Sequence, residues 1–100
     1  MPEMWINRLT AIGSRPQVQR FRDSNWNRHL KARHGDLLEN SPGRIAWQFD
    51  STGSLLEPLR RLSRRWPKLV FLLDLEAQSQ RKKGLAVVQA GRMAHCQFEY

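Results

Sequence analysis

The stretch LRRLSRRWPKLVFLLDLE, residues 59–76, constrains the fold most, because a helical and a strand periodicity meet within it. Large apolar residues recur ahead of Pro67 at intervals of four, three and four, at Leu55, Leu59, Leu62 and Trp66. This spacing predicts a helix that buries one stripe and ends at Pro67. The segment after the proline predicts a strand over residues 69–76, with one face made of Leu69, Phe71, Leu73 and Leu75.

The N-terminal third predicts a strand followed by a helix. Residues 5–12, WINRLTAI, have strand character and end at Gly13-Ser14. Pro16 stands where a helix can begin, with Ser14 as the expected N-cap. We expect this first helix to run to about residue 23, followed either by a break or by a second short helix that carries Trp26 and Leu30.

The middle and the end of the chain each predict a hairpin. Residues 36–40 and 44–50 read as strands around an SPG turn, and RIAWQFD alternates so that Ile45, Trp47 and Phe49 share a face. Ser54 and Glu57 fit a capping box for the second main helix. The polar residues 78–84 predict a loop, and residues 84–89 and 92–100 predict a terminal hairpin that turns at Ala90-Gly91.

The order of these elements predicts the fold class. Strand, helix, strand, strand, helix and strand form the split βαβ arrangement of a ferredoxin-like βαββαβ sandwich, in which two helices cover one face of an antiparallel sheet. The terminal hairpin is added to it. A chain of 100 residues suits one α+β domain, 1–100.

Two stretches carry a resemblance to a known family. NRLTAIG at residues 7–13 resembles the opening strand of the YubB-like ferredoxin-fold proteins of bacterial plasmids and other mobile elements. Residues 59–76 with the later Gly84 are similar to that family's pattern of Leu-Ser, aromatic-Pro, an aliphatic–aromatic strand and a glycine. The FDSTGS segment stands where the family has a tryptophan. The resemblance implies a ferredoxin-like fold and a mobile-element setting, and it implies no activity.

The charge balance favours polyanionic partners. Seventeen Lys and Arg against nine Asp and Glu give a formal net charge of +8. Such an excess favours nucleic acid, an acidic protein or an anionic surface. The longest apolar run, Leu69 to Leu73, is far too short to span a membrane, and the N-terminus lacks the pattern of a signal peptide. One unpaired cysteine is compatible with a reducing cytoplasm, where we expect the protein.

The candidate nucleic-acid contacts are basic residues of the helices and of one loop. The second main helix contributes Arg60, Arg61, Arg64 and Arg65, with Lys68 beyond its end; the first helix and its tail contribute Arg15, Arg20, Arg22, Arg28, Lys31 and Arg33; the loop contributes Arg81, Lys82 and Lys83. Helices on one side of the sheet could merge these charges into a basic plate that binds phosphates without sequence preference. The alternative is a solvated helix face and a solubilising loop.

Other chemistry has little support in the sequence. His29 and His34 are five residues apart, and His95 and Cys96 are adjacent in a strand, so neither pair has metal-ligand spacing. We expect Cys96 to be a buried thiol, and we expect no catalytic, metal or cofactor site. We expect the strands over residues 5–12 and 44–50 to be the central ones. Base stacking on the sheet is not expected either, because the outward residues of the second strand, Ala46, Gln48 and Asp50, make a poor platform.

Two functional hypotheses follow. The first is a non-enzymatic module that binds nucleic acid through the basic helical face. The second is a protein-interaction, adaptor or inhibitor module that acts through the edge strand 92–100, which could pair with a host protein or form a homodimer.

Overall fold

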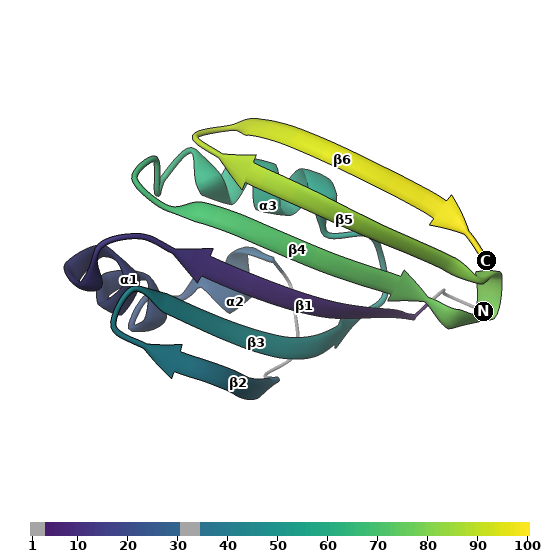
Figure 1. Ribbon diagram of the computed structural model, residues 1–100, viewed down its shortest axis with the longest axis horizontal. Helices are drawn as coiled ribbons and strands as arrows, with labels where there is room; N and C mark the ends of the chain where they lie inside the picture. The colour runs from purple at the N-terminus through teal and green to yellow at the C-terminus, as the bar shows by residue number, and fades with distance from the viewer. Residues whose placement is uncertain (1–3, 31–34) are drawn as a thin grey trace.

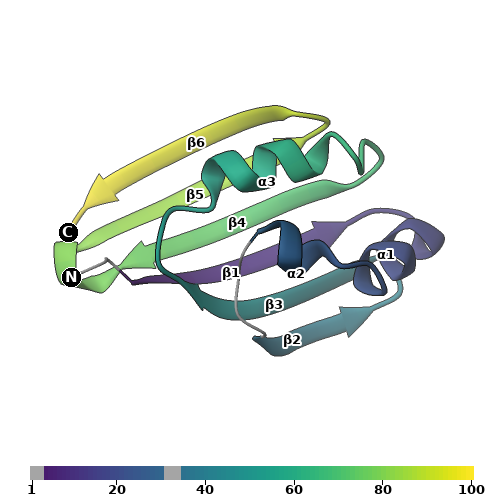
Figure 2. The ribbon, with the colours of Figure 1, turned by 180° about the vertical axis from the view of Figure 1, so that it is seen from behind.

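Six antiparallel strands form one sheet, and three α-helices cover one of its faces (Figures 1 and 2). This computed structural model describes residues 4–30 and 35–100. The strands are β1 (Trp5–Ile12), β2 (Asp36–Ser41), β3 (Arg44–Ser51), β4 (Val70–Ala77), β5 (Lys82–Gln89) and β6 (Arg92–Glu99). The helices are α1 (Arg15–Arg22), α2 (Trp26–His29), α3 (Leu56–Ser63) and the 3-10 turn η1 (Gln78–Gln80). Within the described ranges, no helix is long and apolar enough to cross a membrane.

The strand order across the sheet is β2-β3-β1-β4-β5-β6. The predicted α+β class and the antiparallel sheet are therefore confirmed, and β5 and β6 pair as a hairpin at one edge of this sheet. The hairpin extends the sheet beyond β4, which makes β1 and β4 the two central strands. The sequence had indicated β1 and β3 for this position, and that prediction was wrong because the added hairpin shifts the middle of the sheet.

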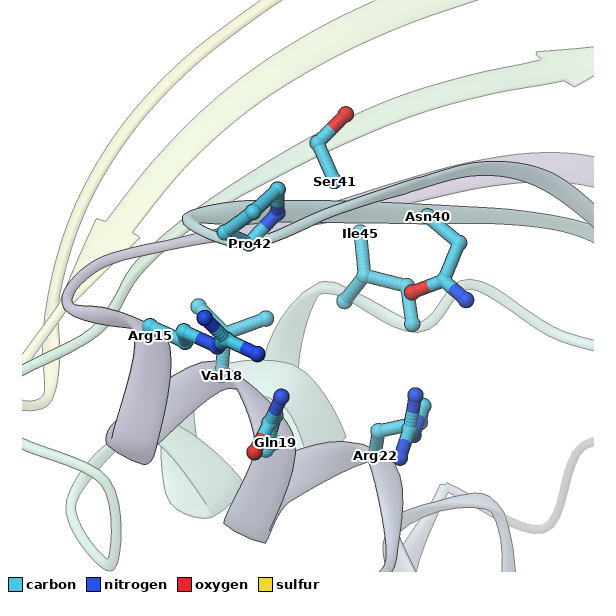
Figure 3. A pocket seen from close by; sticks show the side chains of 8 residues that line it. All are labelled: Arg15, Val18, Gln19, Arg22, Asn40, Ser41, Pro42 and Ile45. Carbon is cyan, nitrogen blue, oxygen red and sulfur yellow. The ribbon is translucent and has the colours of Figure 1, made fainter.

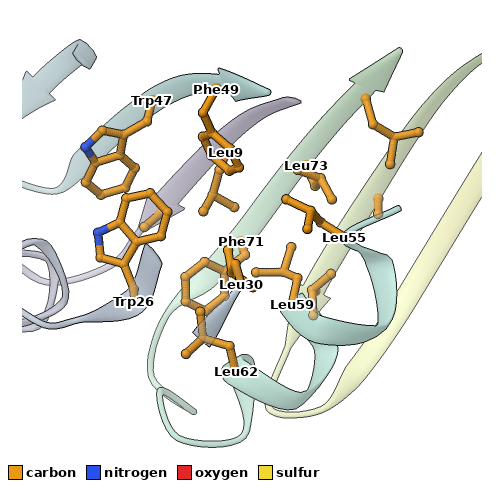
Figure 4. Close-up of a cluster of buried hydrophobic side chains, with 14 of the residues drawn as sticks. Leu9, Trp26, Leu30, Trp47, Phe49, Leu55, Leu59, Leu62, Phe71 and Leu73 are labelled. Carbon is orange, nitrogen blue, oxygen red and sulfur yellow. The ribbon is translucent and has the colours of Figure 1, made fainter. Parts of the chain in front are cut away.

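The core lies between the helices and one face of the sheet. Leu9, Ile45, Phe71 and Val88 alternate inward from four strands and are fully buried. Figure 4 shows Leu55, Leu59 and Leu62 on the sheet side of α3, next to Phe71 and Leu73 of β4. The apolar stripe predicted from the sequence is therefore confirmed.

Phe21 of α1 stands at the centre of an aromatic cluster. Its ring centroid lies 5.6 Å from that of Trp26, 5.3 Å from Trp66 and 5.0 Å from Phe71. Trp26 in turn lies 4.5 Å from Trp47 on β3. Residues 26–29 form the second short helix, one of the two predicted alternatives, and its tryptophan is held between α1 and the sheet.

Three local predictions were wrong. The capping box does not form, because α3 begins at Leu56 and the Glu57 carboxylate turns toward Arg60 instead of back to Ser54. The helix also ends before Pro67, at Ser63, and hydrogen-bonded turns connect it to Leu69. The predicted loop 78–84 is a 3-10 turn, and β5 begins at Lys82, because these residues continue the ladder with β4.

Two buried polar side chains hold the chain in place on either side of α3, at the end of β3 and at the end of the helix itself. The Asn7 amide donates to the Phe49 carbonyl (3.3 Å) and to the Ser51 hydroxyl (3.0 Å), which ties β1 to the end of β3. The Ser63 hydroxyl accepts the Gly91 N–H at 2.9 Å and donates to the Arg60 carbonyl. Ser63 thus attaches the end of α3 to the β5–β6 turn, which gives a structural role to the serine of the Leu-Ser motif.

Candidate functional site

The arginines after Pro58 divide into two rows with different surroundings. Arg61 and Arg65, one helical turn apart, point toward α2, where they line a hollow of about 340 Å³ with His29, Pro58 and Leu62. The Arg65 Nη1 atom lies 3.2 Å from the His29 Nε2 atom. No carboxylate lines this α2–α3 hollow among the described residues. Its charged and polar side chains are therefore two guanidiniums and an imidazole, a chemistry that suits an anion.

The other row, Arg60 and Arg64, is already engaged within the protein. The Arg60 Nε atom donates to the Glu57 carboxylate at 2.9 Å. This bond lowers the pKa of Glu57 and raises the pKa of Arg60. Arg64 lies against the β5–β6 turn, with its Cγ and Nε atoms 2.8 Å from the place where a Cβ on Gly91 would stand. The doublets predicted as equivalent contacts therefore differ, and Arg61 and Arg65 are the ones directed into a hollow.

A second hollow lies between α1 and the β2–β3 turn (Figure 3). Arg15, Gln19 and Arg22 come from α1, and Asn40 faces them from β2. The hollow has a volume of about 180 Å³. Arg22 also donates from Nε to the Asp23 carboxylate at 3.3 Å, so part of its charge is neutralised. We call this the α1 hollow, and its donors suit a second anionic group.

The remaining predicted contacts are placed as follows. Arg20, Arg28 and Lys68 are exposed and belong to the helical layer or its connections. Lys31 and Arg33 lie outside the described residues. Asp36, which could have divided a basic surface, faces away from the helices, since it pairs with Gln48 on the other face of β3.

The predicted Arg81-Lys82-Lys83 contact divides between the two faces of the sheet: Lys82 shares the helix side with Gly84, whereas Arg81 and Lys83 do not join the helical surface. Arg81 and Lys83 both lie over the Tyr100 ring, each 5.7 Å from its centroid. Lys83 also lies 3.5 Å from the Glu76 carboxylate. The alternation of β5 directs Lys83 to the sheet face opposite the helices, which we call the open face.

The open face carries apolar side chains that the sequence reasoning missed. Leu85 of β5 and Phe98 of β6 are 54% and 55% exposed, and Val87 lies beside them. The signal was present in the alternation of β5, where the inward positions Gly84 and Ala86 are smaller than the outward Leu85 and Val87. Trp47 and Phe49, by contrast, lie in the core on the helix side.

Cys96 is exposed on the open face, so the prediction of a buried thiol was wrong. Among the described residues, no layer covers that face of β6, which is an edge strand. His95 points to the other face of β6, and His29 lies on α2, so neither histidine shares a face of the sheet with the thiol. Within residues 4–30 and 35–100, no group of three His, Cys, Asp or Glu side chains could hold a metal ion.

Comparisons with known proteins add no relative. No protein-family model matches the chain, and neither a curated protein nor a solved structure matches it. The resemblance to the YubB-like proteins therefore stays a prediction.

Proposed function

We propose that this protein is a ferredoxin-like nucleic-acid-binding module that contacts the phosphate backbone through its helical layer. The observation that carries the proposal is the α2–α3 hollow, where Arg61, Arg65 and His29 converge with no carboxylate in the lining. The excess of +8 makes the whole molecule attractive to a polyanion.

The chemistry of the hollow suits phosphate in particular. A guanidinium presents a planar fork of donors that binds two phosphate oxygens at once. Arg61 and Arg65 are exposed and lack a carboxylate within bonding distance among the described residues, so binding would break no ion pair of theirs. The α1 hollow offers further donors on the same side of the sheet. Two such contacts along one helical layer favour a backbone over a single small anion.

The proposal includes no sequence readout. The open face of the central strands β1 and β4 carries Arg8, Thr10, Leu72 and Asp74, and no aromatic ring on which a base could stack. Contacts to phosphates position a protein without reading sequence. Following the YubB-like resemblance and the lone cysteine, we place this binding in the bacterial cytoplasm, in a product of a plasmid or another mobile element.

A fluorescence-polarisation titration tests the proposal with labelled duplex DNA, single-stranded DNA and RNA. The test variant is Arg61→Glu/Arg65→Glu, and the control of equal charge is Arg8→Glu/Arg44→Glu on β1 and β3, in which the Arg44–Glu39 salt bridge (3.2 Å) is also removed. Each variant lowers the formal net charge from +8 to +4, since each of two Arg→Glu changes removes two charges.

We expect the helical variant to lose at least tenfold more affinity than the control. The slope of its log association constant against log salt concentration should become less negative by about 1.8, or about 0.9 for each phosphate contact removed. Equal losses of affinity in the two variants would show that only net charge matters and would refute the site. Absence of binding at low salt would refute the function.

A second function is favoured by a separate observation, the unpaired outer edge of β6. An adaptor or inhibitor module could add this edge to the sheet of a host protein. A pull-down from bacterial lysate tests it, and the captured protein should be lost when lysines are placed on the edge at His95 and Gln97.

A further inference from the structure

The outer edge of β6 presents a regular row of backbone groups. β6 pairs with β5 along its whole length without a register shift. The hairpin turns through Ala90 (φ 51°) and Gly91 (φ 82°), the two left-handed residues of a type I′ turn, and the Tyr100 N–H donates to the Arg81 carbonyl at 2.8 Å. The even-numbered residues of β6 therefore bond to β5, and the odd-numbered residues, 93 to 99, direct their N–H and C=O groups outward.

Between its two charged ends, Arg92 and Glu99, this edge lacks the features that usually protect an edge strand. Such features are bulges, prolines, charged side chains, above all lysines, and a short length. The opposite edge, β2, has a register shift between Leu37 and Glu39 and carries acidic side chains. β6 has no proline, lysine or register shift over eight residues. Its open face is also apolar, because Phe98 continues the exposed patch of Leu85 and Val87.

The side chains of β6 are complementary to those of an antiparallel second copy. The strand begins with a cation, Arg92, and ends with an anion, Glu99. Antiparallel pairing of two copies brings the basic end of each strand beside the acidic end of the other; the two side chains lie on opposite faces of the sheet, so the attraction acts between the strand ends without a direct ion pair. Arg92 would also face Tyr100, a ring that already attracts two cations within its own protomer.

We propose that two copies of the chain pair β6 with β6 about a two-fold axis at Cys96, so that their sheets become continuous. The outward N–H and C=O groups belong to odd-numbered residues in both copies. They meet across the interface only when an odd-numbered residue lies opposite another odd-numbered residue, so the numbers of two opposed residues must have an even sum. A pairing of Cys96 with the second copy's Cys96 matches every residue from 92 to 100 and sets Phe98 opposite Ala94. An axis at His95 would instead place two histidines face to face and leave Tyr100 without a partner.

In the proposed register, a disulfide between the two Cys96 residues would report how the two β6 strands are aligned. The two thiols would occupy a directly opposed pair without backbone hydrogen bonds, in which Cα atoms stand about 4.5 Å apart. That separation lies within the range that a disulfide bridges. Diamide should therefore join the two copies: it accepts two electrons and two protons from the thiols, and one S–S bond forms.

The first arm of the experiment measures oligomeric state. Size-exclusion chromatography with light scattering compares the wild-type chain with His95→Lys/Gln97→Lys, both at exposed outward positions, and with Gln78→Lys/Gln80→Lys in η1 as a control of equal charge. We expect a dimer for the wild type and the control, and at least a tenfold weaker dimer for the edge variant. A wild type that is monomeric at all concentrations, alone or bound to another protein, would overturn the proposal, as would a dimer that survives the edge lysines.

The second arm tests the register by diamide cross-linking on non-reducing gels. The wild type should form a covalent dimer, and Cys96→Ser should form none while it remains a dimer by light scattering. Cys96→Ser/Gln97→Cys should also fail to cross-link, because two cysteines at position 97 would be offset along the strands and separated by more than about 7 Å. Equal cross-linking at positions 96 and 97 would overturn the register, and circular dichroism verifies that each variant is folded.

Discussion

Glu57 illustrates how one residue sets the chemistry of its neighbours. Its carboxylate stands at the start of α3 and holds Arg60 by a charge-assisted hydrogen bond. The pKa of Glu57 is lowered first by that bond, and less by the charges of Arg60, Arg61 and Arg64. Glu57 therefore keeps Arg60 occupied, whereas neither Arg61 nor Arg65 forms a salt bridge among the described residues.

We predict that the Glu57 carboxyl titrates below the ordinary range of a glutamate, and that Arg60→Gln raises its pKa more than Arg64→Gln does. A lowered folded-state pKa stabilises the protein at pH values above the unfolded pKa, and this stabilisation is lost as pH falls through the folded pKa. Carboxyl-detected NMR titration measures the three pKa values. An equal rise of the Glu57 pKa in the two variants would contradict the assigned hydrogen bond. In urea denaturation, the free energy of unfolding of Glu57→Gln should fall less steeply with decreasing pH than that of the wild type.

At the scale of elements, α1 and α2 are short and depend on aromatic packing. Helices of eight and four residues are not stable by propensity alone. Phe21 supplies the missing stabilisation, since it is fully buried and touches rings from α2, β3, β4 and the segment after α3.

We predict that Phe21→Ala destabilises the protein by about 3–5 kcal/mol, because it leaves a cavity among four aromatic rings. Phe21→Leu should cost less, about 1–1.5 kcal/mol, since it retains most of the volume. Urea unfolding measures both changes, and the tryptophan emission of Phe21→Ala should shift to the red. A loss below about 1 kcal/mol in the alanine variant would show that the cluster does not hold α1 in place.

The same elements show what a sequence can predict here. The strands and the α3 stripe were predictable because their periods of two and about 3.6 residues are local properties of the chain. The role of Ser63 was not, because its partner Gly91 comes from a hairpin far along the chain. The difference between Arg61 and Arg64 likewise depends on which side of α3 faces α2 and which faces the β5–β6 turn, and this depends on tertiary packing.

At the scale of the whole molecule, the two proposals combine. Edge pairing keeps open faces together, so both helical layers lie on the same face of the continuous sheet. Strands twist by about 20° from one to the next, so an offset of six strands turns the two layers by roughly 120°. A single straight duplex would then reach only one layer.

We predict that the dimer bridges two duplexes. Beads carrying one duplex should capture a second, labelled duplex in the presence of the wild type and of Gln78→Lys/Gln80→Lys. The variant His95→Lys/Gln97→Lys should bind DNA at least as well and capture little, because it is monomeric while its charge is higher. Capture that persists in this edge variant would show that bridging does not require β6.

The register shift in β2 has a further consequence for the number of copies that can assemble edge to edge. A sheet with two receptive edges can template the addition of copy after copy, which is the route to filaments. Here the irregular, acidic β2 leaves each chain with a single receptive strand, and the proposed contact occupies that strand in both copies at once. Assembly then stops at the dimer, so the molar mass measured in solution should level off at that of two chains as the concentration rises, and no fibres should form.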